Sequence, residues 1–475
     1  MMKVLMISAE VAPFAKVGGL ADVAGSLPKA LRARGVDIRV IMPKYRTVLQ
    51  AGYSLQPRLE TVYVPMPSYM SGCALYESVL PDTDIPVYFV EHNMYFDRDS
   101  VYGTGGGFPD NFERLAFFCR ASLSALDGLE WQPDVLHLND WHTTLAAAYN
   151  RAWDLPYGTL FTGHNLGEYY QGTFPWDQIA KAGLDLGDKR VAQCVRNGQI
   201  NLARIGFTFA DLINTVSKGY AKEIQQPEFG GGIDDLAIAR GDDVKGIVNG
   251  IDYDIWNPRD PSLPAPFGPD DLAGKAKCKA MAQKEFGLPQ TPDVPLITLV
   301  TRLDAQKGLD LLEQVIGELG DVQIAILGTG DPRYEEFFSK MAATHDNVGV
   351  KLMFSGSLAK LLYAGGDMFL MPSRYEPCGL GQMIALAYGN LPVVRATGGL
   401  GDTIKEKGKS ANGFRFNAYD AQEMLEAIRR AVAAYHDRKL WSELMQNAFA
   451  SDFSWDASAK QYITLYKQAA SRVCR

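Results

Sequence analysis

The sequence has no long apolar run, no paired cysteines and no excess of basic residues. No apolar stretch approaches the roughly 20 residues that a membrane-spanning helix needs. The six cysteines are scattered and form no C-x-x-C pair, which is typical of free thiols and argues against a disulfide framework or a zinc site. The formal net charge is −8, so neither nucleic acid nor an anionic membrane is an expected partner. Any anion site must therefore be a local basic pocket.

The N-terminus lacks the features of a signal peptide. Its apolar stretch "VLMIS" is too short for a hydrophobic signal region, and Glu10 and Pro13 follow it closely. With unpaired cysteines, this predicts a cytoplasmic protein of bacterial type. A plastid location would require that a transit peptide has been removed.

The common nucleotide-binding motifs are also missing. "GKS" at 408–410 has Thr403 where a P-loop needs a glycine, and "GTGD" at 328–331 lacks the third glycine of a dinucleotide fingerprint. The second motif could line a ligand crevice or form an ordinary turn. A nicotinamide oxidoreductase is disfavoured by the missing fingerprint.

Short apolar stretches alternate with longer helical patterns along the chain. Most of these stretches lack polar alternation, as buried parallel strands do, so βα units and an α/β fold are expected. The expected strands are 3–8, 37–43, 87–91, 134–140 and 157–163 in the first half and 295–303, 322–330, 350–356, 367–373 and 391–399 in the second.

A change in composition marks a domain boundary. Residues 244–271 are rich in Gly, Pro, Asn and Asp, which is typical of a linker. We expect domains at 1–245 and 246–455, each with its own doubly wound parallel sheet of Rossmann type. Residues 456–475 have the pattern of an amphipathic helix.

The stretch "AKVGGLAD" lies between an expected strand and an expected helix. Gly18 and Gly19 would let the backbone approach a ligand, the helix start would offer free N–H groups, and Lys16 would add a positive charge. These features fit a phosphate site. They fit equally well a tight turn with a surface lysine.

Two further clusters lie in the second half. Arg302 and Lys307 follow a strand and precede a helix, where a guanidinium and an ammonium group suit a diphosphate. Glu376 stands in a turn before a helix that begins at Gly381, and its carboxylate could grip a sugar hydroxyl or balance a developing cation. The alternatives are two solvated charges and a helix-capping glutamate.

Polar and aromatic side chains gather at expected strand ends of the first half, where such sheets bind ligands. Aromatic and hydrogen-bonding groups together suit a carbohydrate. The residues of this group are Glu10, Tyr102, Asp140, Trp141, His142, His164 and Asn165.

The ordered set of motifs resembles the bacterial glycogen synthases and plant starch synthases. Eight motifs carry the resemblance over nearly the whole chain: "KVGGLADV", "FPDNFERLAFF", "LHLNDWHT", "FTGHNLGEYYQG", "VNGIDYDIWNP", "TRLDAQKGLDLL", "PSRYEPCGLGQM" and "ATGGLGDT".

This resemblance implies a GT-B fold, in which two Rossmann-like domains face a central cleft, and a C-terminal helix that crosses back to the first domain. It implies retaining transfer of glucose from ADP-glucose to the non-reducing 4-OH end of an α-1,4-glucan. It also implies three sets of residues: catalytic Glu376, Arg302, Lys307 and His164; donor-binding Lys16, Gly18, Gly19, Asp22, Gly379, Leu380 and Gly381; and glucose- or acceptor-binding Glu10, Tyr102, Asp140, Trp141, His142, Asn165 and Asn249.

No cofactor or metal ion is expected. The two Asp-x-Asp pairs, at 82–84 and 252–254, have the surroundings of turns. Partners are expected to be ADP-glucose and a glycogen or starch acceptor. The alternatives are an enzyme of the same fold that uses UDP-glucose or another acceptor, and a non-catalytic glucan-binding protein. The segment after "MFSGS" is expected to be shorter than in the family and to lack its base-contacting aromatic residue, which bears on the choice of donor base.

Overall fold

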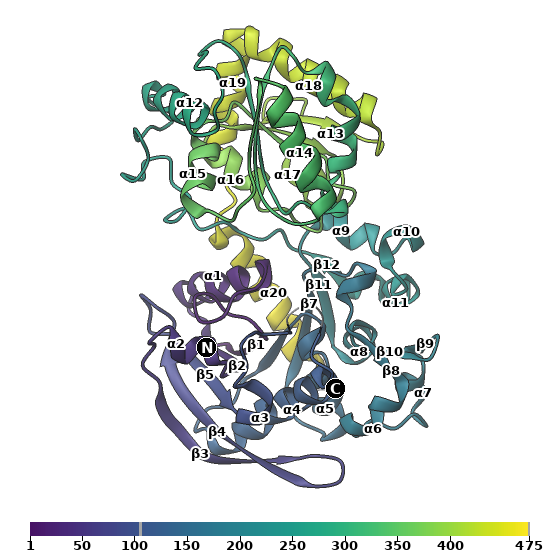
Figure 1. The fold of residues 1–475 in the computed structure, drawn as a ribbon. Helices are drawn as coiled ribbons and strands as arrows, with labels where there is room; N and C mark the ends of the chain where they lie inside the picture. The colour runs from purple at the N-terminus through teal and green to yellow at the C-terminus, as the bar shows by residue number, and fades with distance from the viewer. Residues whose placement is uncertain (104–106, 474–475) are drawn as a thin grey trace. The chain divides into compact units, whose positions relative to one another are not determined.

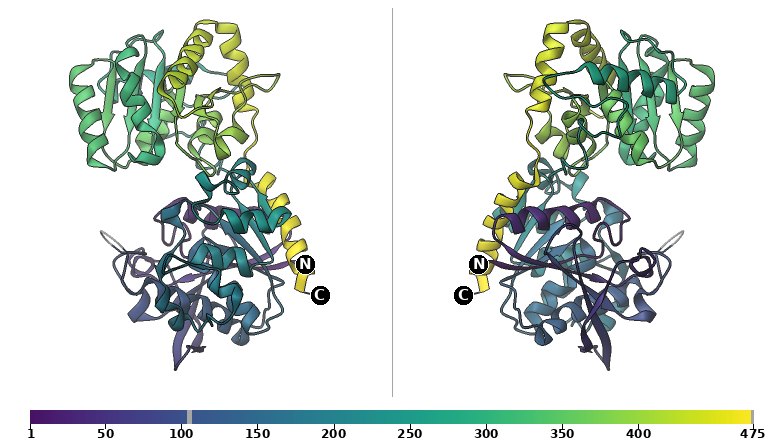
Figure 2. Two further views of the ribbon diagram at one scale, coloured as in Figure 1. Left: turned by 90° about the vertical axis from the view of Figure 1, so that its right-hand side faces the viewer. Right: turned by 90° about the vertical axis from the view of Figure 1, so that its left-hand side faces the viewer.

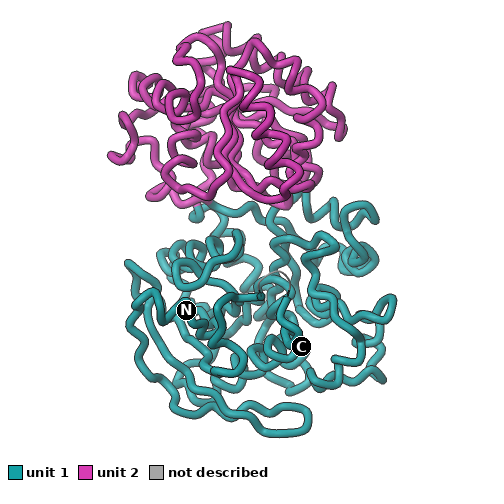
Figure 3. The backbone as a smooth tube through the Cα atoms, in the orientation of Figure 1, with its two compact units in different colours: residues 1–250, 455–475 teal, residues 251–454 magenta. Residues whose placement is uncertain are grey.

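The computed structural model describes residues 1–103 and 107–473, which belong to two compact units (Figure 3). Unit 1 comprises Met1–Gly250 and Trp455–Arg475, and unit 2 comprises Ile251–Ser454. The chain thus divides five residues later than the expected 245/246 boundary. The reason is that residues 246–250 pack on the C-terminal helix: Ser458 Oγ donates a hydrogen bond to the Val248 carbonyl at 2.6 Å.

The main sheet of unit 1 has nine strands in the order β12-β11-β7-β6-β1-β2-β5-β4-β3. The strands from β12 to β5 run parallel, and β4 and β3 extend the sheet antiparallel. A small separate sheet has the order β8-β10-β9. The strands are β1 Lys3–Ile7, β2 Asp37–Pro43, β3 Gln56–Pro65, β4 Met70–Val79, β5 Pro86–Glu91, β6 Val135–Asn139, β7 Gly158–Gly163, β8 Thr173–Pro175, β9 Val195–Arg196, β10 Gln199–Asn201, β11 Leu212–Thr215 and β12 Val244–Gly246.

The helices of unit 1 bury the parallel strands. Strands β6 and β7 are buried along their whole length, which explains why their sequences lack polar alternation. The helices are α1 Gly19–Ala33, α2 Arg46–Gln50, α3 Asn93–Phe96, α4 Asn111–Ser124, α5 Leu145–Ala152, α6 Ile179–Ala182, α7 Lys189–Ala192, α8 Leu202–Phe209, α9 Lys218–Glu223, α10 Pro227–Gly230, α11 Asp234–Arg240 and α20 Trp455–Val473.

Helix α20, at the end of the chain, packs on unit 1 beside α1 and β7 (Figure 2). Its buried residues recur every three or four positions from Trp455 to Ala469, so one face is apolar. Gly158 at the start of β7 permits the close approach, because a Cβ there would lie 2.6 Å from the Ala469 carbonyl. Tyr466 donates or accepts a 2.9 Å hydrogen bond with His137 Nδ1 of β6, which ties the helix to the sheet.

Unit 2 has a six-stranded, wholly parallel sheet in the order β15-β14-β13-β16-β17-β18. This is the Rossmann strand order, whose ligand crevice lies at the carboxyl ends where the order reverses, here β13 and β16. The strands are β13 Leu296–Val300, β14 Gln323–Leu327, β15 Val348–Lys351, β16 Met368–Met371, β17 Leu391–Arg395 and β18 Phe414–Phe416.

Helices cover both faces of this sheet, with α15 and α16 on one side and α13 and α14 on the other (Figure 1). The two units therefore share the α/β architecture expected from the sequence. No helix in the described ranges is long and apolar enough to cross a membrane. The helices of unit 2 are α12 Ala273–Glu285, α13 Leu309–Val315, α14 Pro332–Thr344, α15 Gly356–Gly365, α16 Gly381–Ala387, α17 Gly398–Thr403, α18 Ala421–His436 and α19 Arg438–Phe449.

Candidate active site

The loop between β1 and α1 is held from inside by the carboxylate of Glu10. One carboxylate oxygen accepts hydrogen bonds from the backbone N–H groups of Val17 (2.5 Å) and Gly18 (2.9 Å), and the other accepts from the Tyr102 hydroxyl at 2.6 Å. Glu10 is buried. Both of its oxygens are thus engaged with the protein, so the geometry makes Glu10 a brace for the loop.

Lys16 lies on the outer side of that loop. Its ammonium group forms a 2.6 Å ion pair with Asp22 in the first turn of α1, and about half of its side chain is exposed. A Cβ on Gly18 or Gly19 would meet no atom within 4 Å. The two glycines therefore leave open space beside a cation and a helix start, as close approach of a ligand requires.

Asp140 follows β6 and has an unusual backbone conformation for a non-glycine residue, with φ 55°. Its Oδ1 accepts a hydrogen bond from the backbone N–H of His164, which follows the neighbouring strand β7, at 2.7 Å. Burial raises the pKa of the Asp140 carboxyl to about 7. The structure thus brings two predicted glucose-pocket residues together at adjacent strand ends, with backbone strain at one of them.

The His164 imidazole is fixed by Asn139, whose Oδ1 lies 3.1 Å from Nε2. Burial lowers the pKa of His164 to about 3, so the ring is neutral at physiological pH. The amide of Asn139 donates to the carbonyls of Ile7 and His137, which leaves its oxygen as the acceptor. We therefore assign the His164 proton to Nε2 and a lone pair to Nδ1.

His142 is packed between two aromatic rings. Its ring stacks on Tyr102 with centroids 4.8 Å apart and lies 3.9 Å from Trp141. Its Nδ1 is buried without a hydrogen-bond partner in the described part of the chain, and burial, followed by the charge of Arg114, lowers its pKa to about 3.

Asn165 belongs to the same group, because its backbone N–H also donates a hydrogen bond to the Asp140 carboxylate. Asn165 Oδ1 caps its own turn by accepting from Gly167 N–H at 3.0 Å. Asn249 is buried after β12, and its Oδ1 has no partner among the described residues.

In unit 2, the loops after β13 and β16 meet at the predicted topological switch point. Lys307 Nζ lies 2.7 Å from Glu376 Oε2, and the Ser373 hydroxyl donates to the same oxygen at 2.9 Å. Gly308 makes this possible: it has φ 68°, and a Cβ there would lie 2.0 Å from the Pro372 carbonyl oxygen.

Arg302 lies in the same loop and is 61% exposed along its side chain, against 16% for Lys307. Its guanidinium lies 3.3 Å from an oxygen of Asp304. The structure thus presents one partly buried and one exposed cation at the carboxyl end of β13.

The turn that contains Gly379, Leu380 and Gly381 is fixed by Gln382, a residue that the sequence analysis did not single out. The Gln382 amide donates to the carbonyls of Cys378 (3.0 Å) and Gly379 (2.9 Å), and Gly379 has φ 71°. The sequence does contain a signal for this role. Gln382 is the second residue of the helix, so its side chain can reach back to the carbonyl groups that precede the helix.

The "ATGGLGDT" motif serves packing. A Cβ on Gly399 would lie 2.1 Å from the Cys378 carbonyl oxygen, and the Gly399 N–H donates to the Glu376 carbonyl at 3.1 Å. Helix α17 therefore supports the turn that carries Glu376. Gly399 thus serves close packing, whereas Gly18 and Gly19 face open space.

Phe354 and Ser373 are further residues that the sequence analysis missed. Phe354 follows β15 and is 91% exposed, with Met353 beside it 47% exposed. An exposed aromatic side chain at the carboxyl end of a parallel strand is placed where such sheets bind ligands. Phe354 belongs to the "MFSGS" stretch itself, so it lies before the segment that is expected to lack the family's aromatic residue.

The two Asp-x-Asp pairs lie in turns. Asp82 has φ 62° in the connection between β4 and β5, and Asp252 Oδ1 accepts from the Asp254 N–H at 2.9 Å. Among the residues that the structure describes, no three His, Cys, Asp or Glu side chains form a group that could hold a metal ion.

Comparisons with known proteins find similarity over nearly the whole chain. Residues 3–239 match the starch synthase catalytic domain family, and residues 282–448 match glycosyl transferases group 1. The glycogen synthase of Syntrophotalea carbinolica is 46% identical, covering 98% of this chain and 99% of that protein. The glycogen synthase of Thermotoga maritima is 43% identical, with complete coverage of both.

Solved structures agree. The catalytic domain of starch synthase IV from Arabidopsis thaliana, bound to ADP and acarbose, superposes with a TM-score of 0.88 at 33% identity, covering 99% of each chain. Sucrose-phosphate synthase from Thermosynechococcus elongatus gives 0.62 at 18% identity, covering 99% of this chain and 100% of the other, which shows a shared fold alone. The fold is therefore GT-B, as the sequence predicted.

Proposed function

Because the chain belongs to the family of bacterial glycogen synthases and plant starch synthases, we propose that its donor is ADP-glucose and that it transfers glucose with retention to the non-reducing 4-OH end of an α-1,4-glucan. The chain is a glycogen synthase-type glucosyltransferase. The observation that carries the finer proposal is the Lys307–Glu376 pair at the switch point of the unit 2 sheet. It places a cation and a carboxylate where a sugar nucleotide is expected to bind.

In this proposal, Arg302 and Lys307 stabilise the departing diphosphate. Cleavage of the bond to the anomeric carbon leaves negative charge on the phosphate oxygens, and preorganised cations stabilise it as it develops. Arg302 supplies a planar fork of donors, and Lys307 supplies a fixed point charge. The backbone from Gly379 to Gly381 is the neighbouring polar element, with Leu380 at the start of α16.

Lys16, in unit 1, is proposed as a further donor-binding cation. In this structure its ammonium group is paired with the Asp22 carboxylate. When the donor binds, we expect the ammonium group to leave Asp22 and to pair with a phosphate oxygen. Glu10 keeps the loop in place through Val17 and Gly18. Lys16, Arg302 and Lys307 together carry three positive charges, which offset the roughly two to three negative charges of a diphosphate without a metal ion.

Glu376 and the strand-end residues of unit 1 act on the glucose. Glu376 holds a sugar hydroxyl while its charge favours the cation-like transition state. His164 is neutral, because burial lowers its pKa to about 3, so we assign it a hydrogen-bonding role through its Nδ1 lone pair. Asp140 accepts a hydrogen bond from the His164 backbone and is proposed to bind the glucose beside it. Trp141, His142 and Tyr102 supply the aromatic groups of this part of the site.

Retention is proposed to proceed on one face of the sugar. The bond from the anomeric carbon to the phosphate oxygen breaks, the acceptor 4-oxygen forms its bond on the same face, and the departing phosphate oxygen takes the acceptor proton. The sequence offers no evident nucleophile for a covalent glucosyl intermediate. The acceptor would be bound by residues of unit 1, including Asn165 and Asn249.

Phe354 is proposed to supply a flat apolar surface for the adenine base. It is exposed at the carboxyl end of β15, and base–aromatic stacking tolerates any base because every base has a π face. Donor preference is therefore not decided by stacking alone.

The test is the product. Incubation with ADP-glucose and a maltooligosaccharide should release ADP and lengthen the oligosaccharide by glucose units. Proton NMR of a reaction stopped early should show new α-1,4 linkages. New β linkages would refute retention, and binding of starch without ADP release would support a non-catalytic glucan-binding protein. The enzyme is proposed to act in the cytoplasm.

A further inference from the structure

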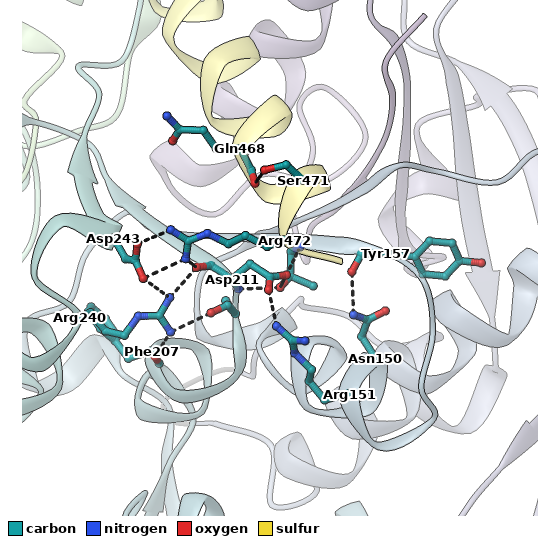
Figure 4. Close-up of polar contacts among 12 residues, drawn as sticks. Asn150, Arg151, Tyr157, Phe207, Asp211, Arg240, Asp243, Gln468, Ser471 and Arg472 are labelled. Carbon is teal, nitrogen blue, oxygen red and sulfur yellow. Dashed lines mark hydrogen bonds and ion pairs between the residues drawn. The ribbon is translucent and has the colours of Figure 1, made fainter. Parts of the chain in front are cut away.

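A cavity of about 310 Å³ opens in unit 1 beside the start of β11. Its walls come from α5, α7, the end of α8, α11 and the last turn of α20. Figure 4 shows three of its four arginines around Asp211 and Asp243. Strand β11 runs parallel to β7 and β6. The cavity therefore lies at their amino edge, opposite the carboxyl edge where Asp140 and His164 stand. The four arginines are Arg151, Arg190, Arg240 and Arg472.

Two of these arginines have a structural task. Arg240 donates to the carbonyls of Phe207 (2.9 Å), Ala210 (2.8 Å) and Asp211 (2.6 Å), where α8 ends, and Arg472 donates to the Asp211 carbonyl at 2.6 Å. These bonds satisfy the free carbonyls at a helix C-terminus. Carbonyl groups are neutral, so the positive charge of both guanidinium groups remains in the wall.

The carboxylates of the wall offset only part of that charge. Asp243 pairs with Arg472 and lies 3.4 Å from Arg240, and Asp211 pairs with Arg151. Four positive and two negative side chains line the cavity, which leaves a surplus of two charges in a protein whose net charge is −8.

Part of this surplus is accessible. Arg190 is 60% exposed and Arg151 is 45% exposed along the side chain. Arg190 pairs with Asp188, which stands outside the wall, and even with that carboxylate counted one positive charge is left over. Arg240 Nε is buried without a hydrogen-bond partner in the described ranges. The wall thus has both charge and a donor that the protein itself does not satisfy.

We propose that this cavity binds a phosphate group, either as inorganic phosphate or as the phosphate of a small monoester. Guanidinium groups converge on it from several elements, and their forked donors match phosphate oxygens. A cavity of about 310 Å³ is larger than a phosphate ion and leaves room for an organic remainder. Since Arg472 belongs to α20, a bound phosphate would strengthen the attachment of that helix to unit 1.

The experiment measures thermal unfolding of the full chain in the presence of saturating ADP. Because ADP occupies the donor diphosphate site, added phosphate cannot raise Tm by binding there. Inorganic phosphate and, separately, glycerol phosphate are added at ionic strength matched with sodium chloride. We expect Tm to rise by roughly 2–4 °C at about ten times the dissociation constant. A stronger effect of the monoester would identify it as the preferred form, and an equal effect would identify the bare ion.

The matched variants are R151Q/R190Q and the single change R190E, which leaves the Arg151–Asp211 pair intact, with Arg429→Gln in unit 2 as an exposed control. The phosphate-induced rise should vanish in the first two and persist in the control. Retention of the ADP-induced rise shows that each variant is folded. The proposal would be overturned if phosphate did not raise the Tm of the wild-type protein. It would also be overturned if phosphate raised the Tm of R190E and R151Q/R190Q as much as that of the wild-type protein.

Discussion

The Lys307 ammonium nitrogen lies 2.7 Å from Glu376 Oε2, although 69 residues separate the two. Lys307 is mostly buried, with 16% of its side chain exposed, and Glu376 is held by the Ser373 hydroxyl as well. The proposed leaving-group cation is therefore already in a fixed position before the donor arrives. Preorganisation of this kind is what makes a charge effective in the transition state.

Lys307→Ala should lower kcat by roughly 10²–10³ because it removes one charge partner of the leaving group. Initial rates of ADP release with glycogen measure the effect, and Lys284→Ala, an exposed lysine on α12, is the control. Tm is followed in parallel, since the change also leaves Glu376 without its ion pair. A kcat near that of the control in a folded variant would remove Lys307 from the mechanism.

Arg302→Ala should lower kcat by a similar factor of roughly 10²–10³ with little change in Tm. The side chain is 61% exposed and its pair with Asp304 is a surface pair, which adds little to stability. Arg302→Lys should recover only part of the activity because the fork geometry is lost. Full activity in Arg302→Lys would show that only the charge matters, and full activity in Arg302→Ala would refute the role.

The buried histidines should make unit 1 sensitive to acid. Burial lowers the pKa of His142 to about 3, whereas an unfolded histidine titrates near 6.5. Between these values the unfolded chain binds a proton that the folded chain does not. Stability is therefore lost as the pH falls below about 6.5. The pKa of Asp140 is raised to about 7, so its protonation stabilises the folded state as the pH falls and opposes the effect of the histidines. A variant that changes one histidine alone separates the two effects.

His142→Gln should flatten this dependence. The fall in Tm between pH 6.5 and pH 5 is expected to be smaller in His142→Gln than in wild type, because the slope loses up to about 1.4 kcal/mol per pH unit. His436→Gln, at an exposed position on α18, should keep the wild-type slope. An unchanged slope in His142→Gln would mean that His142 is not held neutral by the fold.

Much of the fold could be predicted because buried parallel strands have a clear signature. The stretches at β1, β6, β7, β13 and β16 are mostly apolar, and the sequence predicts each of them. The hairpin of β3 and β4 was not expected, since its strands are largely exposed and mix polar with apolar residues at a sheet edge. Strands of three or four residues, such as β11 and β18, are too short for periodicity to identify.

For the site, the rule that ligands bind at carboxyl ends of parallel strands selects segments that the structure does place at such ends. It could not show which side chains bond to the protein itself. Glu10 is engaged by Val17, Gly18 and Tyr102, and the contact with Tyr102 joins residues 92 positions apart. Such bonds depend on tertiary placement, and neither composition nor spacing contains them.

Activity should not depend on a divalent cation. Three basic side chains are proposed to balance the diphosphate, and both Asp-x-Asp pairs lie in turns. The rate in excess EDTA is expected to equal the rate in Mg²⁺ to within about twofold, since loss of a charge partner would cost far more. Complete loss of turnover in EDTA, restored by Mg²⁺ or Mn²⁺, would refute the three-cation account.

The most direct test of the central claim compares donors. Purified protein is assayed with glycogen and either ADP-glucose or UDP-glucose over a range of concentrations, and nucleoside diphosphate release gives kcat/KM for each. The account predicts that kcat/KM is higher for ADP-glucose and that the released ADP matches the glucose incorporated into glycogen. A higher value for UDP-glucose, or release of ADP without incorporation, would contradict it.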